Sequence, residues 1–434
     1  MANVKGSNSA KCALCQAGGK PQVSHIIPRF VGKWLKESSA TGFLRAAKNL
    51  NVRLQDTTKM PLLCLDCEKR LSKFENYFAR RIFYPYQEMG IQEFSYDELL
   101  LKFIVSIGWR VLFFDIQQKA LDDSPNLALY AKRALKTWRD YLLELRRDEG
   151  DYEHHMFFLD FVEGNAAEIP SGFQWYALRA IDGCLALSKE TVFTYTKFPG
   201  IIFVSTIYPT QLEGWVGTRI KRGGGKIAHP QEIAYPGFRD FLIDRSKRLF
   251  DSGISNVQEK KVVETMKSNP ERLLSSKSFQ VAIAESMRRR ENKKQKLPTA
   301  VSELINIVEK GGIDQSLPER ERNFQKLQID LIADRLADID LTAAQRLERD
   351  IIANVSAARD SHEQKLTISD MGDIVIFFLT LVGSTKMERL ERINRMFREI
   401  ENSGSYSKAQ MILMFTWDPI DQVDRSFDWG CQLR

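Results

Sequence analysis

The sequence lacks several features that would point to a membrane, a secretory route or a bound nucleotide. Its longest apolar run, IVIFFLTLVG at 374–383, is well short of the roughly 20 residues that a transmembrane helix needs. The first residues, MANVKGSNSA, lack the apolar core of a signal peptide. The glycine-rich stretch KRGGGK at 221–226 does not end in the Gly-Lys-Ser/Thr of a phosphate-binding loop, so we expect a hairpin or loop there. These absences predict a soluble, cytoplasmic protein with no membrane partner.

Cysteine is sparse and unevenly placed. Of the six cysteines, four form two CxxC pairs, CALC at 12–15 and CLDC at 64–67, while Cys184 and Cys431 are isolated. This distribution favours metal binding in a reducing compartment over disulfide bonding. Two CxxC turns can place four thiolates on one tetrahedral zinc ion, which is then closed to substrate and purely structural. The alternative is four buried or redox-active thiols. The predicted zinc ligands are Cys12, Cys15, Cys64 and Cys67.

Positive charge is concentrated near the N-terminus. The formal net charge of the chain is +7, whereas residues 1–90 hold 15 Lys and Arg against 6 Asp and Glu, a net of +9, which leaves −2 for the remainder. A small basic module attracts phosphate backbones through counterion release. We therefore predict that the cysteine-bearing segment binds nucleic acid, with a solvated basic surface as the alternative.

Hydrophobic periodicity separates helical from β-rich parts of the chain. The apolar run LLLKFIVSIGWRVLFFDIQQ at 99–118 predicts a helix central to a core, and an amphipathic helix follows it. Short β-branched and aromatic runs bounded by Gly and Pro predict a small sheet between about 152 and 228. From about residue 238 the pattern is helical again. The adjacent His154 and His155 have no partner at ligand spacing, so no site is predicted there.

This organisation predicts an α+β protein of three domains. Residues 1–90 form a small zinc-held module, residues 91–250 a mixed helical and β domain, and residues 251–434 a mainly helical domain. No motif in the helical remainder identifies a ligand. We expect it to serve targeting, sensing or assembly, either as a homo-oligomer or with a partner protein.

The N-terminal segment resembles a known nuclease family. The order of CALC, SHIIP at 24–28 and LLCLDCEKRLSKFE at 62–75 is similar to the HNH branch of the His-Me finger endonucleases, over roughly residues 10–80. The resemblance implies a zinc-stapled, treble-clef-like ββα fold in which His25 is the general base that activates water against a phosphodiester. It also implies a catalytic Mg²⁺ or Mn²⁺ beside the structural zinc.

The residues aligned with the family's catalytic metal ligands are Ser24, before the histidine, and Glu68, after the second cysteine pair. Glu68 is an anionic oxygen ligand that suits Mg²⁺ or Mn²⁺, whereas neutral Ser24 would be a weak ligand. The family's loop asparagine is replaced by Lys59. Gln55 or Asp56 could take its place, Asp56 as an additional ligand of the divalent ion.

Other charged side chains of this segment have expected roles. Glu75 is seven residues beyond Glu68 on the same helical face, and it is either a carboxylate behind the metal site or a plain surface charge. Several basic side chains are placed to meet backbone phosphates. They are Arg29, Lys69, Arg70, Lys73, Arg80 and Arg81.

Three hypotheses follow from these residues. The favoured one is a metal-dependent HNH-type endonuclease that hydrolyses phosphodiester bonds of DNA, with RNA as the alternative substrate. The second is a zinc-stapled nucleic-acid-binding protein whose catalytic centre has decayed, as Ser24 suggests. The third is a structural or protein-interaction protein that uses zinc only for folding, against which the charge distribution argues. HNH modules fused to long additional domains suggest, by analogy alone, a role in anti-phage defence.

Overall fold

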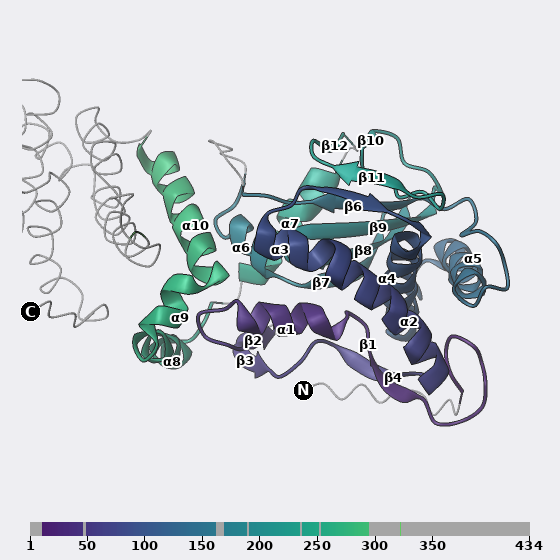
Figure 1. Ribbon diagram of the computed structural model, residues 1–434, viewed down its shortest axis with the longest axis horizontal. Helices are drawn as coiled ribbons and strands as arrows, with labels where there is room; N and C mark the ends of the chain where they lie inside the picture. Colours follow the sequence, from purple (N-terminus) through teal and green to yellow (C-terminus); the bar gives the residue numbers. More distant parts are fainter. Residues whose placement is uncertain are drawn as a thin grey trace, which may run out of the picture. The chain divides into compact units, whose positions relative to one another are not determined.

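The computed structural model describes residues 11–294, apart from 47–48, 162–168, 189–190, 235–236 and 251–252, together with Arg322 (Figure 1). The chain divides into two compact units, one of residues 1–162 and 169–262 and the other of residues 163–168 and 263–434. Cys431, the apolar run at 374–383 and most of the predicted third domain lie outside the described residues.

Short strands and helices surround the cysteines in the N-terminal part of the first unit. In chain order they are β1 (Gln22–His25), α1 (Arg29–Glu37), β2 (Leu44–Ala46), β3 (Asn49–Leu54), β4 (Lys59–Leu63), α2 (Leu65–Phe78), the π-helix η1 (Ala79–Phe83) and α3 (Tyr84–Met89). β1 pairs antiparallel with β4, with His25 opposite Lys59, and β2 pairs antiparallel with β3. Helix α1 therefore lies in the connection between β1 and the β2–β3 hairpin, and α2 follows β4 directly.

Helix α4 (Glu98–Gln117) is enclosed on nearly all sides. Every residue from Leu100 to Leu112 except Lys102 is buried, as expected of a helix that is apolar all round. The Asp97 side chain caps its start by accepting a hydrogen bond from the Leu99 N–H at 2.8 Å. Helix α5 (Pro125–Leu142) packs against α4. The two predicted helices are thus confirmed.

A four-stranded antiparallel sheet packs against α4 (Figure 1). Its strands are β6 (His154–Phe158), β7 (Asp182–Leu187), β8 (Val192–Phe198) and β9 (Ile201–Tyr208), in the spatial order β6-β9-β8-β7. Both faces are covered, because Phe203 joins the core around α4 while its neighbours Ile202 and Val204 join a second core with Trp215 and Phe238. Strand β8 is consequently buried along its whole length. The sheet predicted between about 152 and 228 is confirmed.

Further short elements complete the description. In the first unit, β5 (Glu93–Tyr96) pairs with β11 (Gly225–Ala228), and β10 (Trp215–Val216) pairs with β12 (Glu232–Ile233). The remaining helices are α6 (Phe173–Arg179), α7 (Phe238–Phe250) and α8 (Asn256–Lys267), which crosses the boundary between the units, and α9 (Pro270–Ser275) and α10 (Lys277–Lys294) of the second unit. No helix in the described part of the chain is both long and apolar enough to cross a membrane.

The cysteine-bearing segment shares its core with the rest of the first unit. Phe78 of α2 stacks on Phe103 of α4 with ring centroids 4.2 Å apart, and it contacts Phe203 of β9 at 5.4 Å. Helix α2 is therefore held against α4 and the sheet by aromatic packing. The described chain is a mixed helical and β structure, as predicted, while the predicted domain boundaries at residues 90 and 250 stay predictions.

Candidate metal centre and the histidine site beside it

Four cysteine side chains converge, as the sequence predicted. Cys12 and Cys15 precede β1, Cys64 is the N-cap residue of α2, and Cys67 lies in the first turn of that helix. Their sulfur atoms all lie within 4.8 Å of one another, and Cys15 Sγ is 3.7 Å from Cys64 Sγ. Four sulfurs at about 2.3 Å from one tetrahedral ion lie about 3.8 Å apart. The cluster can therefore hold a metal ion such as zinc.

Local backbone geometry presents the two CxxC pairs. The first forms a tight turn, in which the Gln16 N–H donates to Cys12 O at 2.9 Å and Gln16 has a φ of 62°. The Ala13 N–H donates to Leu62 O at 2.9 Å, which ties this turn to β4. Burial raises the pKa of Cys12, but backbone hydrogen bonds from Cys15, Cys64 and Leu14 outweigh it and lower this pKa to about 7. Burial instead raises the pKa of Cys15 and, together with hydrogen bonds and charge from the neighbouring cysteines, that of Cys67.

His25 is paired with Asp56 rather than enclosed as a core ring. His25 Nε2 lies 2.8 Å from Asp56 Oδ2, and the two side chains are 21% and 26% exposed. Burial raises the pKa of Asp56, but hydrogen bonds from His25 and from the Thr57 N–H lower it by more. The pKa of Asp56 is therefore below its ordinary value. An ionised carboxylate only accepts hydrogen bonds, so Nε2 is the donor to Asp56, and in the corresponding neutral tautomer Nδ1 is the nitrogen without a proton.

The loop that carries Asp56 is fastened to the chain after β1. Asp56 Oδ1 accepts a hydrogen bond from the Thr57 N–H at 2.9 Å, and the Thr57 hydroxyl donates to Ile27 O at 3.0 Å. These bonds fix the carboxylate relative to His25. Asp56, rather than Gln55, is therefore the side chain that pairs with His25, and its roles as the replacement for the loop asparagine and as a metal ligand stay predictions.

A buried arginine from α4 holds the backbone of His25. Arg110 is 3% exposed, and its Nη1 donates to His25 O at 3.1 Å and to Glu75 Oε1 at 2.7 Å. Its Nε donates to Ser106 O at 3.2 Å. One nitrogen thus joins β1 to α2, which places Glu75 beside the histidine strand. Glu75 is thus an ion-paired side chain that is 23% exposed, and its role as a carboxylate behind the metal site stays a prediction.

Ser24 points away from the face that carries His25. Neighbouring residues on a strand project to opposite faces, and the Ser24 side chain is buried at 2% exposure. Its hydroxyl donates to Gln22 O at 3.3 Å and accepts a hydrogen bond from the Leu63 N–H at 3.2 Å. These bonds satisfy the hydroxyl within the β1–β4 pair. The assignment of Ser24 as a metal ligand stays a prediction that this geometry does not support.

Glu68 has an oxygen that lacks a partner. Its Oε1 is buried and makes no hydrogen bond within the described residues. A buried, unpaired carboxylate oxygen is costly unless a cation or a donor completes it. Glu68 is in the first turn of α2, directly after Cys67. This oxygen is the observation that fits a divalent cation at the position that the sequence predicted.

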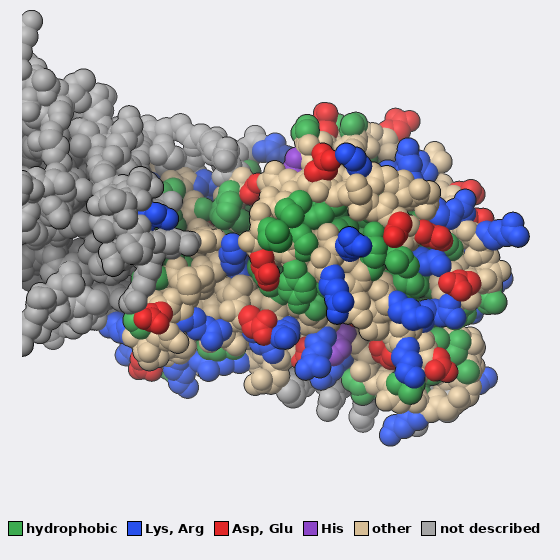
Figure 2. All heavy atoms as spheres, viewed as in Figure 1, with side chains coloured by type: hydrophobic (Ala, Val, Ile, Leu, Met, Phe, Trp, Pro, Cys, Tyr) green, Lys and Arg blue, Asp and Glu red, His purple; other side chains and the backbone are tan. Residues whose placement is uncertain are grey.

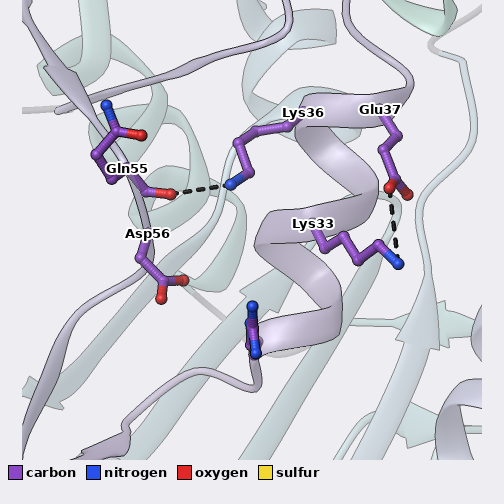
Figure 3. A pocket seen from close by; sticks show the side chains of 6 residues that line it. Lys33, Lys36, Glu37, Gln55 and Asp56 are labelled. Carbon is purple, nitrogen blue, oxygen red and sulfur yellow. Dashed lines mark hydrogen bonds and ion pairs between the residues drawn. The ribbon is translucent and has the colours of Figure 1, made fainter.

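A pocket adjoins the histidine pair. It has a volume of about 330 Å³ and lies between α1 and the segment that carries Asp56 (Figure 3). Lys36 crosses from α1 and donates to Gln55 O at 2.9 Å, while Lys33 pairs with Glu37 at 3.7 Å (Figure 3). The pocket is lined by Arg29, Lys33, Lys36, Glu37, Gln55 and Asp56.

The predicted phosphate-contacting residues fall into two groups. Arg70 is partly buried and lies 3.5 Å from both Leu142 O and Glu144 Oε2, which ties α2 to the end of α5. The others are exposed. These are Arg29, Lys69, Lys73, Arg80 and Arg81. Lys and Arg side chains are also visible on the surface over α1 (Figure 2).

Sequence reasoning missed Lys33, Lys36 and Arg110. The spacing of Arg29, Lys33 and Lys36 at i, i+4 and i+7 is a signal that could have identified a basic face of α1. No sequence pattern indicates the role of Arg110, because it lies in an apolar helix and its partners His25 and Glu75 are distant in sequence.

The adjacent histidines of β6 belong to the core. His154 Nδ1 lies 2.8 Å from Ser205 Oγ, and His155 Nδ1 lies 2.9 Å from Thr218 Oγ1. Both side chains are buried, and burial lowers the pKa of His154 to about 3. Both rings are packed in the core, and His155 Nε2 also lies 3.3 Å from Glu153 Oε2.

Comparison of the chain with protein-family models, with curated proteins and with solved structures gives no match.

Proposed function

We propose that this protein is a metal-dependent, HNH-type endonuclease that hydrolyses phosphodiester bonds in nucleic acid, with DNA as the first candidate substrate. The observation that carries the proposal is the His25–Asp56 pair, at 2.8 Å, on the strand that Arg110 anchors. The order of elements supports the family resemblance. β1 carries His25 and pairs with β4, and α2, which carries Glu68, follows β4 directly.

Zinc is the metal proposed for the four cysteines. The sulfur separations suit a tetrahedral ion, and soft thiolate ligands select zinc over magnesium or calcium. Such a site has no open position for substrate. Its role would be to fix the turn at Cys12–Cys15 against the start of α2, and so to hold Glu68 in place relative to β1.

A hard divalent cation, Mg²⁺ or Mn²⁺, is proposed for the catalytic step. The unpaired Oε1 of Glu68 is the ligand atom that fits it best. When bound, the cation would stabilise negative charge on the phosphate and on the leaving oxygen.

The protein's own residues supply the proton transfer. His25 Nδ1 takes a proton from water as the water oxygen bonds to phosphorus, and the phosphorus–oxygen bond on the opposite side breaks. Asp56 holds the Nε2–H and stabilises the imidazolium that forms, in the manner of a carboxylate behind a catalytic histidine. Solvent then protonates the leaving oxygen, which gives an alcohol end and a phosphate monoester end.

A binding protein with a decayed catalytic centre is the second candidate. The observation in its favour is Ser24, whose hydroxyl is used by the backbone of Gln22 and Leu63. A site that lacks this ligand would depend on Glu68 and on the substrate phosphate to hold the cation, and its metal affinity would be correspondingly low.

Cleavage of supercoiled plasmid by the purified full chain, titrated with Mg²⁺ or Mn²⁺, separates the two candidates. If Glu68 holds the cation, Glu68→Gln should need a much higher metal concentration and should cut at least about 10²-fold more slowly at a fixed one. Glu88→Gln, which removes an exposed carboxylate from α3, is the matched control. Metal-independent cutting, or equal rates for Glu68→Gln and the control, would contradict the assignment.

No cutting of DNA or RNA by the parent with either metal, together with retained binding, would favour the decayed-site candidate.

A further inference from the structure

The pocket between α1 and Gln55–Asp56 is not explained by the hydrolytic step alone. We infer that it binds one phosphate group of the nucleic-acid strand, adjacent to the bond that His25 addresses. This inference rests on the proposed function for its choice of ligand, but its test does not require cleavage.

Arg29 is the central observation. It is exposed, it lines the pocket, and its guanidinium makes no hydrogen bond or ion pair within the described part of the chain. A guanidinium presents a planar fork of donors that matches two phosphate oxygens at once. An unpaired fork beside a pocket is therefore suited to a phosphate group.

The start of α1 adds to the attraction. Arg29 is the first residue of this nine-residue helix, whose first turn contains no acidic side chain. Helix N-termini carry partial positive charge and favour phosphate, and the guanidinium of Arg29 adds positive charge at the same end of α1. The ammonium group of Lys36 is held at the opposite wall through its bond to Gln55 O (Figure 3).

The acidic side chains of the pocket are already engaged. Glu37 pairs with Lys33 at 3.7 Å, and Asp56 accepts hydrogen bonds from His25 and the Thr57 N–H. Lys59 Nζ also lies 3.7 Å from Asp56 Oδ2. An entering phosphate therefore meets carboxylates whose charge is offset and a guanidinium whose charge is not.

The pocket is fixed relative to His25. Asp56 lines the pocket and also bonds His25 Nε2 at 2.8 Å, and Thr57 fastens the same loop to Ile27. A volume of about 330 Å³ is near the lower end for small-ligand sites, so it suits one nucleotide unit rather than a stretch of duplex. A phosphate held here would set which neighbouring bond faces the base.

Binding of a fluorescent oligonucleotide to the full-length His25→Ala protein, without divalent ions, tests this inference. Arg29→Gln in that background should weaken binding about tenfold, as expected for loss of a charge-assisted hydrogen bond. Its salt dependence, as the slope of log K against log salt, should become shallower by about 0.7 for a single strand or about 0.9 for a duplex. Lys36→Gln should act in the same direction.

Two controls make the result specific to the pocket and to phosphate. Lys132→Gln with Lys136→Gln removes two exposed charges from α5 and should change affinity little. A methylphosphonate oligonucleotide of the same sequence, which has a neutral backbone, should bind the Arg29→Gln protein and its background equally.

An Arg29→Gln effect no larger than that of the α5 control, or one that persists with the neutral backbone, would overturn the inference. Neither outcome decides whether the protein is an endonuclease, because the cleavage assay tests that proposal separately.

Discussion

Removal of the Glu75 carboxylate should destabilise the first unit measurably, because it leaves a buried guanidinium without its counter-ion. Arg110 is 3% exposed and its Nη1 lies 2.7 Å from Glu75 Oε1, while its other partners, His25 O and the backbone and hydroxyl oxygens of Ser106, are neutral. Breaking a buried ion pair from one side costs about 3–5 kcal/mol. Because Glu75 is 23% exposed, water screens part of the interaction, and we expect about 3 kcal/mol for Glu75→Ala.

Glu75→Gln should cost about half as much, since its amide oxygen can still accept a hydrogen bond from Arg110. For a unit of this size, 1 kcal/mol corresponds to a shift in melting temperature of about 2–4 °C. Glu75→Ala should therefore lower the Tm by about 6–12 °C. Tryptophan fluorescence is a suitable probe, because Trp109 and Trp138 are buried in the same core.

Two controls separate the ion pair from other effects. Glu88→Ala, at an exposed position of α3, should leave the Tm nearly unchanged, and the metal content of Glu75→Ala should equal that of the parent. If Glu75→Ala shifted the Tm no more than Glu88→Ala, the argument that Arg110 depends on this carboxylate would be refuted.

Two further predictions concern the metal centre and pH. Elemental analysis should give about one zinc per chain for the parent. Cys64→Ser should lose the zinc and lower the Tm, since such sites contribute folding free energy directly. A parent protein that contains no zinc and is nevertheless stably folded would contradict this. Lys197 is fully buried, and burial lowers its pKa to about 7, whereas an unfolded lysine titrates near about 10.4. Between these values the unfolded chain binds the proton and the folded chain does not, so the free energy of unfolding should rise from pH 7 to about pH 9.5. This rise in the free energy of unfolding should be absent in Lys197→Met. If the parent and Lys197→Met had the same pH profile, Lys197 would not be its cause.

The parts of the fold that could be predicted are those with a local signature. The two CxxC pairs specify their cluster because each turn places two sulfurs together, whatever lies between the pairs. Helix α4 is recognisable from a long apolar run, and β6, β8 and β9 from short runs rich in β-branched and aromatic residues. The sequence around His25 marks it as a candidate, and the structure places its side chain on β1 at 21% exposure.

The parts that could not be predicted depend on contacts between distant residues. Spacing alone left Gln55 and Asp56 open as replacements for the loop asparagine, because which side chain reaches His25 depends on the β1–β4 register. Arg110 lies 85 residues from His25, and no periodic pattern connects them. The pairing of β5 with β11 is similarly remote, since long-range strand pairing follows from packing rather than from local preference.

The most direct test of the central claim is the single-turnover cleavage rate of His25→Ala beside the parent, with plasmid DNA, saturating Mn²⁺ and equal zinc content in both proteins. If His25 is the general base, the variant should cut at least about 10²-fold more slowly, while its affinity for DNA should be nearly unchanged. A His25→Ala protein that cuts as fast as the parent would contradict the claim and would leave His25 as a structural partner of Asp56.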